Sequence, residues 1–331
     1  MRPQALRPAE QKEKTVKSPE SIYISSIGCY VPKKIVTNDD LAQTVDTSDE
    51  WIHSHTGIRE RRIADTEEEC SDLAVKAVLD LFAKDAGHKE GIDGIVVATA
   101  TADHYGFPST ACIVAEKLGI KGAAALDIGA GCTGFIYALE VARAMILSGS
   151  MTKALVIGAE KLSNVVNWKD RNTCVLFGDG AGCVLLEKTE ERKGIIDSTL
   201  HAEGSGSLAL AITKESRTIT MEGRAVYNFA VRAIGDTVLE LLRRNDLSID
   251  KIKWIVPHQA NKRIINACSK RYGFNAETFY MNIDRYANTS AASIPIALAE
   301  MEEKSLLKAG QYILFVGFGA GLTYGGTLIQ W

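Results

Sequence analysis

The chain has 331 residues, 46% of them hydrophobic, and a formal net charge of −3 at pH 7. This length and hydrophobic content can form one large two-lobed unit or two domains, and the near-balanced charge argues against a general nucleic-acid-binding protein. Seven cysteines without a C-x-x-C pair argue against a disulfide framework and a zinc site, and they favour a reducing, cytoplasmic location.

Residues 1–20 are polar, carry mixed charge and contain three prolines, so they are predicted to form a flexible N-terminal tail. No apolar run of signal-peptide length follows them. Because no run of about 18 apolar residues occurs elsewhere in the sequence, we expect no membrane span and no membrane partner.

After residue 20, strand-like apolar runs alternate with helix-length segments, and this order predicts an α/β fold. Gly119, Gly149 and Gly273 lie just past helix-length segments, where glycine is a common C-cap. Strands are predicted at residues 94–99, 123–128, 154–158, 174–177, 182–186, 254–256 and 312–317. Helices are predicted at residues 72–83, 110–118, 134–147, 227–244, 261–272 and 294–303.

The alternation occurs twice. Residues 92–158 read strand, helix, strand ending near Cys132, helix, strand, and residues 252–317 read the same way with a short strand reaching Asn288. This predicts two pseudo-duplicated halves, residues 21–190 and 191–331, with a site between them. The alternative is the ordinary alternation of any α/β protein.

Cys132 is the candidate nucleophile. It follows an apolar strand-like segment and small residues, and it precedes a long helical pattern. The helix dipole and the unpaired N–H groups of a first helical turn favour the thiolate, which is the reactive form. Gly129, Gly131 and Gly134 would allow a sharp turn that exposes the side chain. The alternative is a small buried hydrophobic residue, a common role for cysteine.

The same three glycines spell G-x-G-x-x-G, and Glu160 follows the next predicted strand. This pattern resembles a dinucleotide-binding fingerprint and would make the chain an NAD-dependent dehydrogenase. Such a motif usually opens its domain, however, and its acidic residue usually lies nearer. The interpretation also leaves the polar segments around His258 and Asn288 unexplained.

Those two segments carry side chains suited to serve a thiol. His258 follows an apolar strand and precedes a helix, which suits a catalytic imidazole. Asn288 is either a helix N-cap or a neutral amide donor that stabilises an enolate without titrating. The glycine-rich run at residues 317–321 is either a tight turn or a place where a backbone N–H approaches a reacting carbonyl.

Together these segments resemble the β-ketoacyl-[acyl carrier protein] synthase III family, the initiating condensing enzymes of type II fatty-acid synthesis. The resemblance runs from about residue 21 to residue 331, and it implies a thiolase fold of five layers, α-β-α-β-α, acting as a homodimer. The motifs that carry it are Val-Asp-Thr-Ser-Asp-Glu-Trp-Ile (45–52), Thr-Gly-Ile-Arg-Glu-Arg (56–61), Cys-Thr-Gly-Phe (132–135), Phe-Gly-Asp-Gly-Ala-Gly (177–182), His-Gln-Ala-Asn (258–261) and Asn-Thr-Ser-Ala-Ala-Ser (288–293).

The resemblance implies that Cys132 attacks the thioester of a short acyl-CoA primer, acetyl-CoA or similar, and keeps the acyl group. The backbone N–H groups of Cys132 and Ala320 would form an oxyanion hole. His258 and Asn288 would donate hydrogen bonds to the enolate that forms when malonyl-acyl carrier protein (malonyl-ACP) loses CO2. The product would be a 3-ketoacyl-ACP. Loss of CO2 drives the reaction, so neither a metal nor a redox cofactor is expected, and the CoA thioester is a substrate.

The resemblance also implies binding residues. Trp51 and Arg171 match positions that hold the CoA adenine, and His55 stands where an arginine commonly packs beside it. Phe107 matches a residue that reaches across the dimer to the primer pocket, and Phe318 is expected near it. The residues expected to bind acyl carrier protein are Gln259, Lys262, Arg263, Lys270 and Arg271, of which the residues at 263, 270 and 271 share a helix face.

Two further departures from the family pattern stand out: Asn228 replaces a basic residue that often helps dock the carrier, and Ala320 replaces a common glycine. The nearest alternative is a Cys-His-Asn condensing enzyme of secondary metabolism with another primer or extender. A non-catalytic scaffold of the same fold is the other alternative, and the intact Cys132, His258 and Asn288 argue against it.

Overall fold

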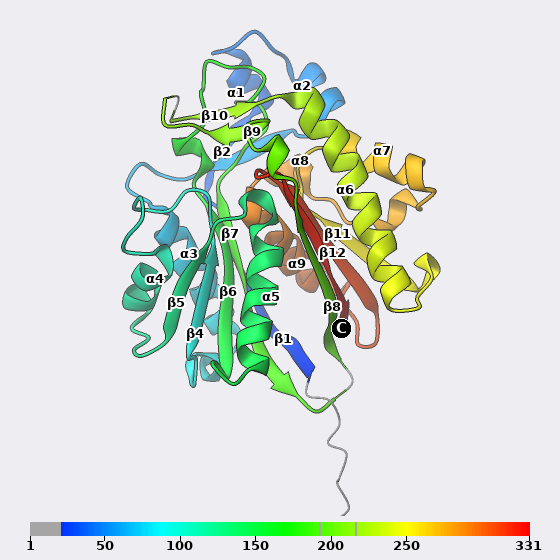
Figure 1. Ribbon diagram of the computed structural model, residues 1–331. Coiled ribbons are helices and arrows are strands. Elements are labelled where there is room, and N and C mark those ends of the chain that lie inside the picture. Colours follow the sequence, from blue (N-terminus) through cyan, green and yellow to red (C-terminus); the bar gives the residue numbers. More distant parts are fainter. Residues whose placement is uncertain (1–20, 192, 216) are drawn as a thin grey trace, which may run out of the picture.

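The computed structural model describes residues 21–191, 193–215 and 217–331 (Figure 1). The tail predicted at residues 1–20 lies outside the described residues. Two larger sheets dominate the described part. The first has the strand order β1-β7-β6-β4-β5 and the second the order β11-β12-β13-β8.

The strands of the first sheet are β1 (Ser21–Tyr30), β4 (Gly94–Ala98), β5 (Ala124–Ile128), β6 (Lys153–Glu160) and β7 (Gly180–Thr189). β4 pairs in parallel with β5 and β6, and β7 runs antiparallel to β6 and β1. The strands of the second sheet are β8 (Gly194–Ala202), β11 (Ile252–Pro257), β12 (Tyr312–Gly319) and β13 (Thr323–Gln330). β11 is parallel to β12, and β13 is antiparallel to β12 and β8. The series β4-β6-β7-β1 and β11-β12-β13-β8 thus share one pattern, which supports the predicted duplication; the boundary at residue 190 stays a prediction.

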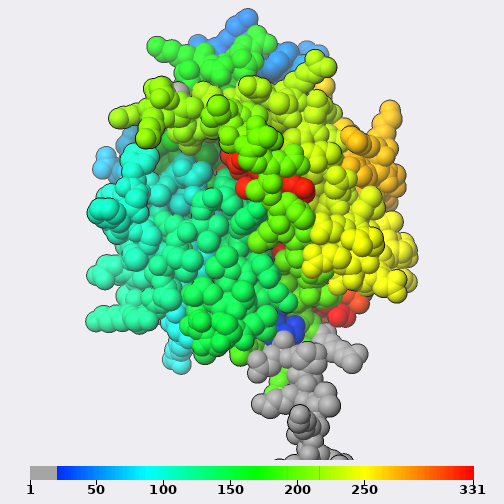
Figure 2. All heavy atoms as spheres, in the orientation of Figure 1, coloured from blue at the N-terminus to red at the C-terminus, as the bar shows by residue number. Residues whose placement is uncertain are grey.

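Helices form three layers around the two sheets. α5 (Gly134–Leu147) and α9 (Ser293–Glu303) contact strands of both sheets and lie between them. α3 (Cys70–Lys84) and α4 (Thr110–Leu118) pack on the first sheet, and α6 (Gly223–Arg244) and α7 (Lys262–Tyr272) cover the second. The spheres of Figure 2 place the cyan and green residues of the first half on one side and the yellow residues of α6 on the other.

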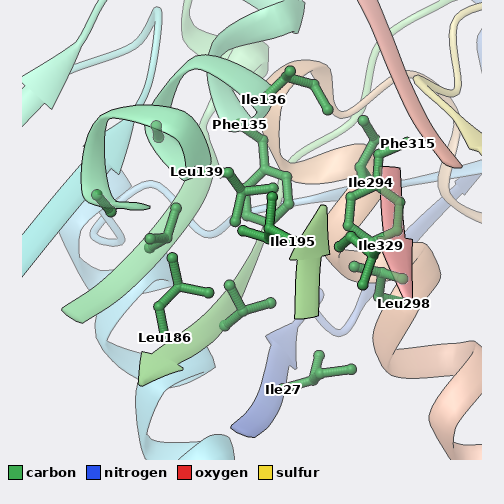
Figure 3. Close-up of a cluster of buried hydrophobic side chains, with 14 of the residues drawn as sticks. Ile27, Phe135, Ile136, Leu139, Leu186, Ile195, Ile294, Leu298, Phe315 and Ile329 are labelled. Atoms are coloured by element: carbon green, nitrogen blue, oxygen red, sulfur yellow. The ribbon is translucent and has the colours of Figure 1, made fainter. Parts of the chain in front are cut away.

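The central helices are apolar because they are covered from both sides. Phe135, Ile136 and Leu139 of α5 have no exposed surface, and they meet Phe315 of β12 in one continuous cluster. Figure 3 shows this cluster, with Ile294 and Leu298 of α9 packed beside them. α9 is buried from Ser293 to Met301, which explains its apolar run, whereas α5 leaves Ala144 and Leu147 exposed.

Smaller elements gather at one end of the layers, the top of Figure 1. They include the pairs β2 (Lys34–Thr37) with β3 (Glu60–Ile63) and β9 (Leu210–Ile212) with β10 (Ile219–Met221), and the helices α1 (Asn38–Ala42), α2 (Asp49–Thr56) and α8 (Ile283–Tyr286). Short 3-10 turns are η1 (Ala86–Lys89), η2 (Gly131–Thr133), η3 (Leu162–Asn164), η4 (Gly204–Gly206), η5 (Ile249–Lys251), η6 (Ala276–Thr278) and η7 (Ser290–Ala292).

One predicted strand, residues 174–177, is wrong. This segment forms turns, in which the N–H of Cys174 donates to the carbonyl of Asp170 at 2.9 Å and the N–H of Leu176 donates to that of Thr173 at 3.0 Å. The short strand predicted before Asn288 is likewise reduced to isolated bridges, Phe177 with Asn288 and Ile255 with Phe279. Both segments are buried loops whose apolar runs are too short to distinguish a strand from another buried conformation.

No helix within the described ranges is long and apolar enough to cross a membrane. The same ranges contain no group of three or more histidine, cysteine or acidic side chains arranged to hold a metal ion. All seven cysteines are free thiols.

Candidate active site

Cys132 lies in η2, between the end of β5 and the start of α5. The turn depends on Gly131, whose φ of 52° lies in the left-handed region that favours glycine. β12, which ends at Gly319, packs directly against the cysteine. A Cβ added to Gly319 would lie only 2.6 Å from the backbone nitrogen of Cys132. The backbone around the thiol is therefore fixed from two sides, and the side chain is only 8% exposed.

We expect Gly319→Ala to displace the nucleophile. The new methyl group would also lie 2.9 Å from Cβ of Cys132, so β12 or η2 must move. Such overpacking costs about 1–3 kcal/mol, which thermal unfolding should show together with slower alkylation of Cys132. Gly204→Ala is the control, because a Cβ there meets nothing within 4 Å. Equal behaviour of the two variants would contradict the tight contact.

His258 follows β11 and continues its pairing, since its N–H donates to the carbonyl of Val316 at 2.8 Å. Nδ1 of the ring lies 2.8 Å from Oγ of Ser293, the first residue of α9, and the ring meets Phe318 edge to face. All of this is buried, with His258 only 1% exposed. The ring orientation is therefore set by α9 and β12 together.

Asn288 is held by its backbone and by one side-chain oxygen. Its N–H donates to Leu176 at 2.9 Å, its carbonyl accepts from Gly178 at 3.0 Å, and Oδ1 accepts from the N–H of Ser290 at 2.8 Å. With Oδ1 occupied, the Nδ2 group is the donor that Asn288 presents. Its neighbours Ala287 and Ser290 have φ values of 56° and 49°, a costly conformation that the surroundings must impose. Asn288 is not the predicted N-cap, since Thr289 and Ala292 precede the two helical segments that follow.

Two cavities meet at Cys132. The first measures about 990 Å³, part of which is open to solvent, and its lining includes Cys132, His258, Asn288, Trp51 and Arg263. The second measures about 870 Å³, part of which is open to solvent, and extends from Cys132 toward β9 and β10. The apolar side chains that line it are Leu162, Phe177, Leu210, Ile212 and Ile219. The three residues selected from the sequence thus line one cavity together, and Cys132 also lines the second.

The expectation of an exposed thiol that favours the thiolate is wrong for this structure. Burial raises the pKa of Cys132 to about 12, although hydrogen bonds from Ser290 and from its own N–H lower it. Burial also lowers the pKa of His258 to about 3, against a small opposing effect of the Ser290 carbonyl. Loss of water around the thiol outweighs the backbone groups of the helix start. The site therefore holds a neutral thiol and a neutral imidazole near pH 7.

The three residues predicted to bind the CoA adenine lie together: Trp51 and His55 line the first cavity, and Arg171 lies beside Trp51. Oγ of Ser48 accepts a hydrogen bond from the backbone N–H of Trp51 and so caps α2. This cap fixes the position of Trp51 in the first turn of the helix. His55, one turn later, stacks on that indole at 4.5 Å between ring centroids. The guanidinium of Arg171 lies 4.7 Å from the centroid of the Trp51 ring and donates to the carbonyl of Asp46 at 2.8 Å.

Of the other predicted residues, some lie at the site and the rest are exposed on the surface. Ala320 follows β12. A Cβ added to Gly131 would lie 3.0 Å from the backbone nitrogen of Ala320, so the N–H of Ala320 is close to the turn that carries Cys132. Phe318 lines the first cavity beside His258, whereas Phe107 is 90% exposed and lines neither cavity. The basic side chains of α7 are exposed on its surface: Lys262, Arg263, Lys270 and Arg271.

The prediction that Gln259 binds acyl carrier protein is wrong, because its side chain is buried and not available to a protein partner. It is only 3% exposed. Nε2 donates to the carbonyls of Pro257 at 2.8 Å and Tyr280 at 3.1 Å, and Oε1 accepts from the N–H of Asn282 at 3.1 Å. Its amide holds the loop after β11 in place. Ser293, in contrast, was not singled out as a site residue, because a serine at a helix start carries no sequence signal for contact with a distant histidine.

Comparisons with known proteins agree with this geometry. Residues 126–204 match the family model 3-oxoacyl-[acyl-carrier-protein (ACP)] synthase III, and residues 242–331 match the model of its C-terminal part. A beta-ketoacyl-[acyl-carrier-protein] synthase III of Caldanaerobacter subterraneus is 48% identical, over 93% of this chain and 97% of the relative. One from Clostridium novyi is 47% identical, over 94% and 99%.

Solved structures agree as well. The synthase III structures of Thermus thermophilus and Aquifex aeolicus match with TM-scores of 0.90 at 43% and 44% identity. The matches cover 93% and 94% of this chain, and 99% and 100% of those chains. They confirm the predicted thiolase fold, whose five layers are those described above. The chain belongs to the β-ketoacyl-[acyl-carrier-protein] synthase III family.

Proposed function

We propose that this chain joins a short acyl-CoA primer to malonyl-ACP in a decarboxylative Claisen condensation, which initiates type II fatty-acid synthesis. The observation that carries this proposal is that Cys132, His258 and Asn288 line one cavity and Cys132 also lines a second, in a chain of the synthase III family. The product is a 3-ketoacyl-ACP. Seven free thiols are compatible with a reducing, cytoplasmic location.

In the first half-reaction, Sγ of Cys132 attacks the thioester carbon of the primer and CoA leaves as the thiol. The N–H groups of Cys132 and Ala320 stabilise the oxyanion that forms on the way. The acyl chain then lies in the second cavity, whose lining is apolar, while the CoA arm occupies the first. Phe107 would complete the primer pocket from a second protomer of a homodimer.

In the second half-reaction, malonyl-ACP loses CO2 and leaves an enolate that attacks the acyl carbon on Cys132. Asn288 donates to the enolate oxygen through Nδ2, since Oδ1 is already occupied by Ser290. His258 is neutral, so its Nε2 carries a proton to donate only when Nδ1 accepts from the Ser293 hydroxyl at 2.8 Å. Release of CO2 drives the step, and the proposal needs neither a metal nor a redox cofactor.

For the partners, the exposed basic residues of α7 suit an acidic carrier protein and the phosphates of CoA. Lys262 and Arg263 lie at the start of α7, where Arg263 lines the first cavity, while Lys270 and Arg271 lie in its last turn. Asn228 of α6 stands where the family resemblance implies a basic residue, so docking here would depend more on α7.

Trp51→Ala should weaken binding of the primer donor. Loss of one base-stacking indole costs about 1–3 kcal/mol, so KM for acetyl-CoA should rise about tenfold while kcat changes little, as steady-state kinetics would measure. Trp168→Ala is the matched control, because this indole is partly exposed and lines neither cavity. A fall in kcat with unchanged KM would contradict the adenine assignment.

The proposed function itself is tested by mixing the protein with acetyl-CoA and malonyl-ACP and analysing the carrier by mass spectrometry. The proposal requires 3-ketobutyryl-ACP, formed with release of one CO2 for each product. Longer, branched or aromatic primers in parallel reactions would identify the donor class. Failure of every donor with a folded protein and malonyl-ACP would overturn the assignment.

A further inference from the structure

The second half-reaction proposed above needs one particular form of the His258 ring. The buried imidazole is neutral near pH 7, so it carries a single ring proton, on either Nδ1 or Nε2. Nδ1 faces Ser293, so only the form with the proton on Nε2 can donate to the enolate. Whatever keeps the proton on Nε2 therefore takes part in catalysis without touching the substrate.

The hydroxyl group of Ser293 selects this form. Its Oγ lies 2.8 Å from Nδ1 of His258, and it accepts from the backbone N–H of Gln259 at 3.3 Å. An amide N–H can only donate, so of these two partners Nδ1 alone can receive the hydroxyl proton. Ser293 is buried and so shielded from bulk water. With Nδ1 accepting from Ser293, the proton of the neutral ring stays on Nε2.

The side chain of Gln259 holds the backbone that makes this contact. Nε2 of the buried amide donates to the carbonyls of Pro257 at 2.8 Å and Tyr280 at 3.1 Å, so both of its protons are used. Oε1 accepts from the N–H of Asn282 at 3.1 Å. These three bonds tie the residue directly after His258 to the end of β11 and to residues 280–282, and they fix the N–H that points at Ser293.

Helix α9 anchors the same network at a second point. Glu300 lies seven residues after Ser293, which is two turns along α9 on the same helix face. Its buried carboxylate accepts from Nδ2 of Asn282 at 3.0 Å and forms an ion pair with Lys304. Asn282 therefore joins the Gln259 amide to α9. The loop after β11 is held to this helix at both Ser293 and Glu300.

Building on the proposed function, we propose that Ser293 and Gln259 are positioning residues that keep the His258 proton on Nε2, where it stabilises the enolate of the second half-reaction. Neither residue lines the first or the second cavity, so both act through His258 and not on the substrate. Their loss should damage the enolate step and spare primer loading, for which the proposed function uses the N–H groups of Cys132 and Ala320.

The position of the ring proton can be measured without any turnover. Two-bond proton–nitrogen correlation spectra of the ¹⁵N-labelled wild type at pH 7 should place the His258 proton on Nε2. The signals of His258 are identified by their absence from His258→Gln. Ser293→Ala removes the hydroxyl donor at Nδ1, so the ring should shift toward the form protonated on Nδ1. Ser293→Thr keeps the hydroxyl group and should keep the wild-type form.

The kinetic test separates the two half-reactions. Ser293→Ala should slow the decarboxylation of malonyl-ACP on the order of 10²-fold, as expected for loss of one donor to a developing oxyanion. Single-turnover loading of Cys132 from acetyl-CoA should stay near the wild-type rate, and Ser293→Thr should recover most of the lost decarboxylation. Ser269→Ala is the matched control, because this buried serine donates to the carbonyl of Phe274 at 2.6 Å and lines neither cavity.

Gln259→Glu tests the second positioning residue with little change in volume. One carboxylate oxygen can still accept from the N–H of Asn282, but the other would face the two carbonyl groups that now receive the Nε2 protons. The loop after β11 should loosen, and decarboxylation should fall more than loading. Wild-type rates of both half-reactions in Gln259→Glu would overturn the assignment of Gln259.

A wild-type ring protonated on Nδ1 would overturn the proposal. Wild-type decarboxylation in Ser293→Ala, or an equal loss of loading and decarboxylation in that variant, would overturn it as well. The wild-type spectrum decides the matter should the variants fail to fold. A wild type with its proton on Nε2 that nevertheless forms no 3-ketoacyl-ACP would instead contradict the proposed function, so the two failures are distinguishable.

Discussion

Cys132→Ser should lower condensation by at least about 10³-fold. Burial raises the pKa even of the thiol to about 12, and a hydroxyl group in the same place is far less acidic and a weaker nucleophile. The substitution removes little volume, so the fold and the first cavity should remain. Condensation is measured as 3-ketoacyl-ACP formed per enzyme, and donor binding by the KM or Kd for the acyl-CoA.

Cys112→Ser is the matched control, because Cys112 is an exposed thiol on α4 that lines neither cavity. It should retain wild-type condensation. Turnover of Cys132→Ser within a few-fold of the wild type would exclude Cys132 as the nucleophile, and loss of activity in both variants would point to a general sensitivity to thiol replacement.

Asn288→Asp should damage the second half-reaction far more than the first. One carboxylate oxygen can still accept from the N–H of Ser290, but the other replaces the Nδ2 donor with a negative charge that faces the enolate. Loss of one such donor costs on the order of 10²–10³-fold, and charge repulsion adds to it. Decarboxylation of malonyl-ACP, followed as CO2 release, should fall by this factor, while acyl loading of Cys132 stays near the wild-type rate.

Asn275→Asp provides the same chemical change at an exposed 3-10 turn outside both cavities, and it should leave both half-reactions unchanged. An equal loss of loading and decarboxylation in Asn288→Asp would contradict the enolate role and indicate a collapsed site.

The helices can be predicted from the sequence because helix signals are local. The predicted bounds 110–118 and 134–147 are those of α4 and α5, where apolar periodicity is uninterrupted, and α4 ends at a left-handed glycine. β13 was not predicted, because its Gly325 and Gly326 disfavour a strand locally. They are required by neighbours distant in the chain: a Cβ on Gly325 would lie 2.3 Å from the carbonyl oxygen of Thr199.

The site was predictable in its residue types but not in its electrostatics. Cys132, His258 and Asn288 each stand at the end of a strand-like segment, and only the family resemblance joined them in advance. Burial, which decides the pKa values of Cys132 and His258, depends on how both sheets close over the site. Glu160 matches the acidic residue of a dinucleotide fingerprint in the sequence, yet it has no exposed surface, and its carboxylate is hydrogen-bonded to Ala100 and Thr101.

Whether Cys132 carries the primer is decided by intact-protein mass spectrometry after mixing with acetyl-CoA, butyryl-CoA and isobutyryl-CoA in turn, followed by peptide mapping. We expect a single acyl adduct, located on Cys132 and absent from Cys132→Ser, with the most efficient donor identifying the primer class. A folded protein that acquires no adduct from any donor, or acquires it on another residue, would contradict the claim that Cys132 carries the primer.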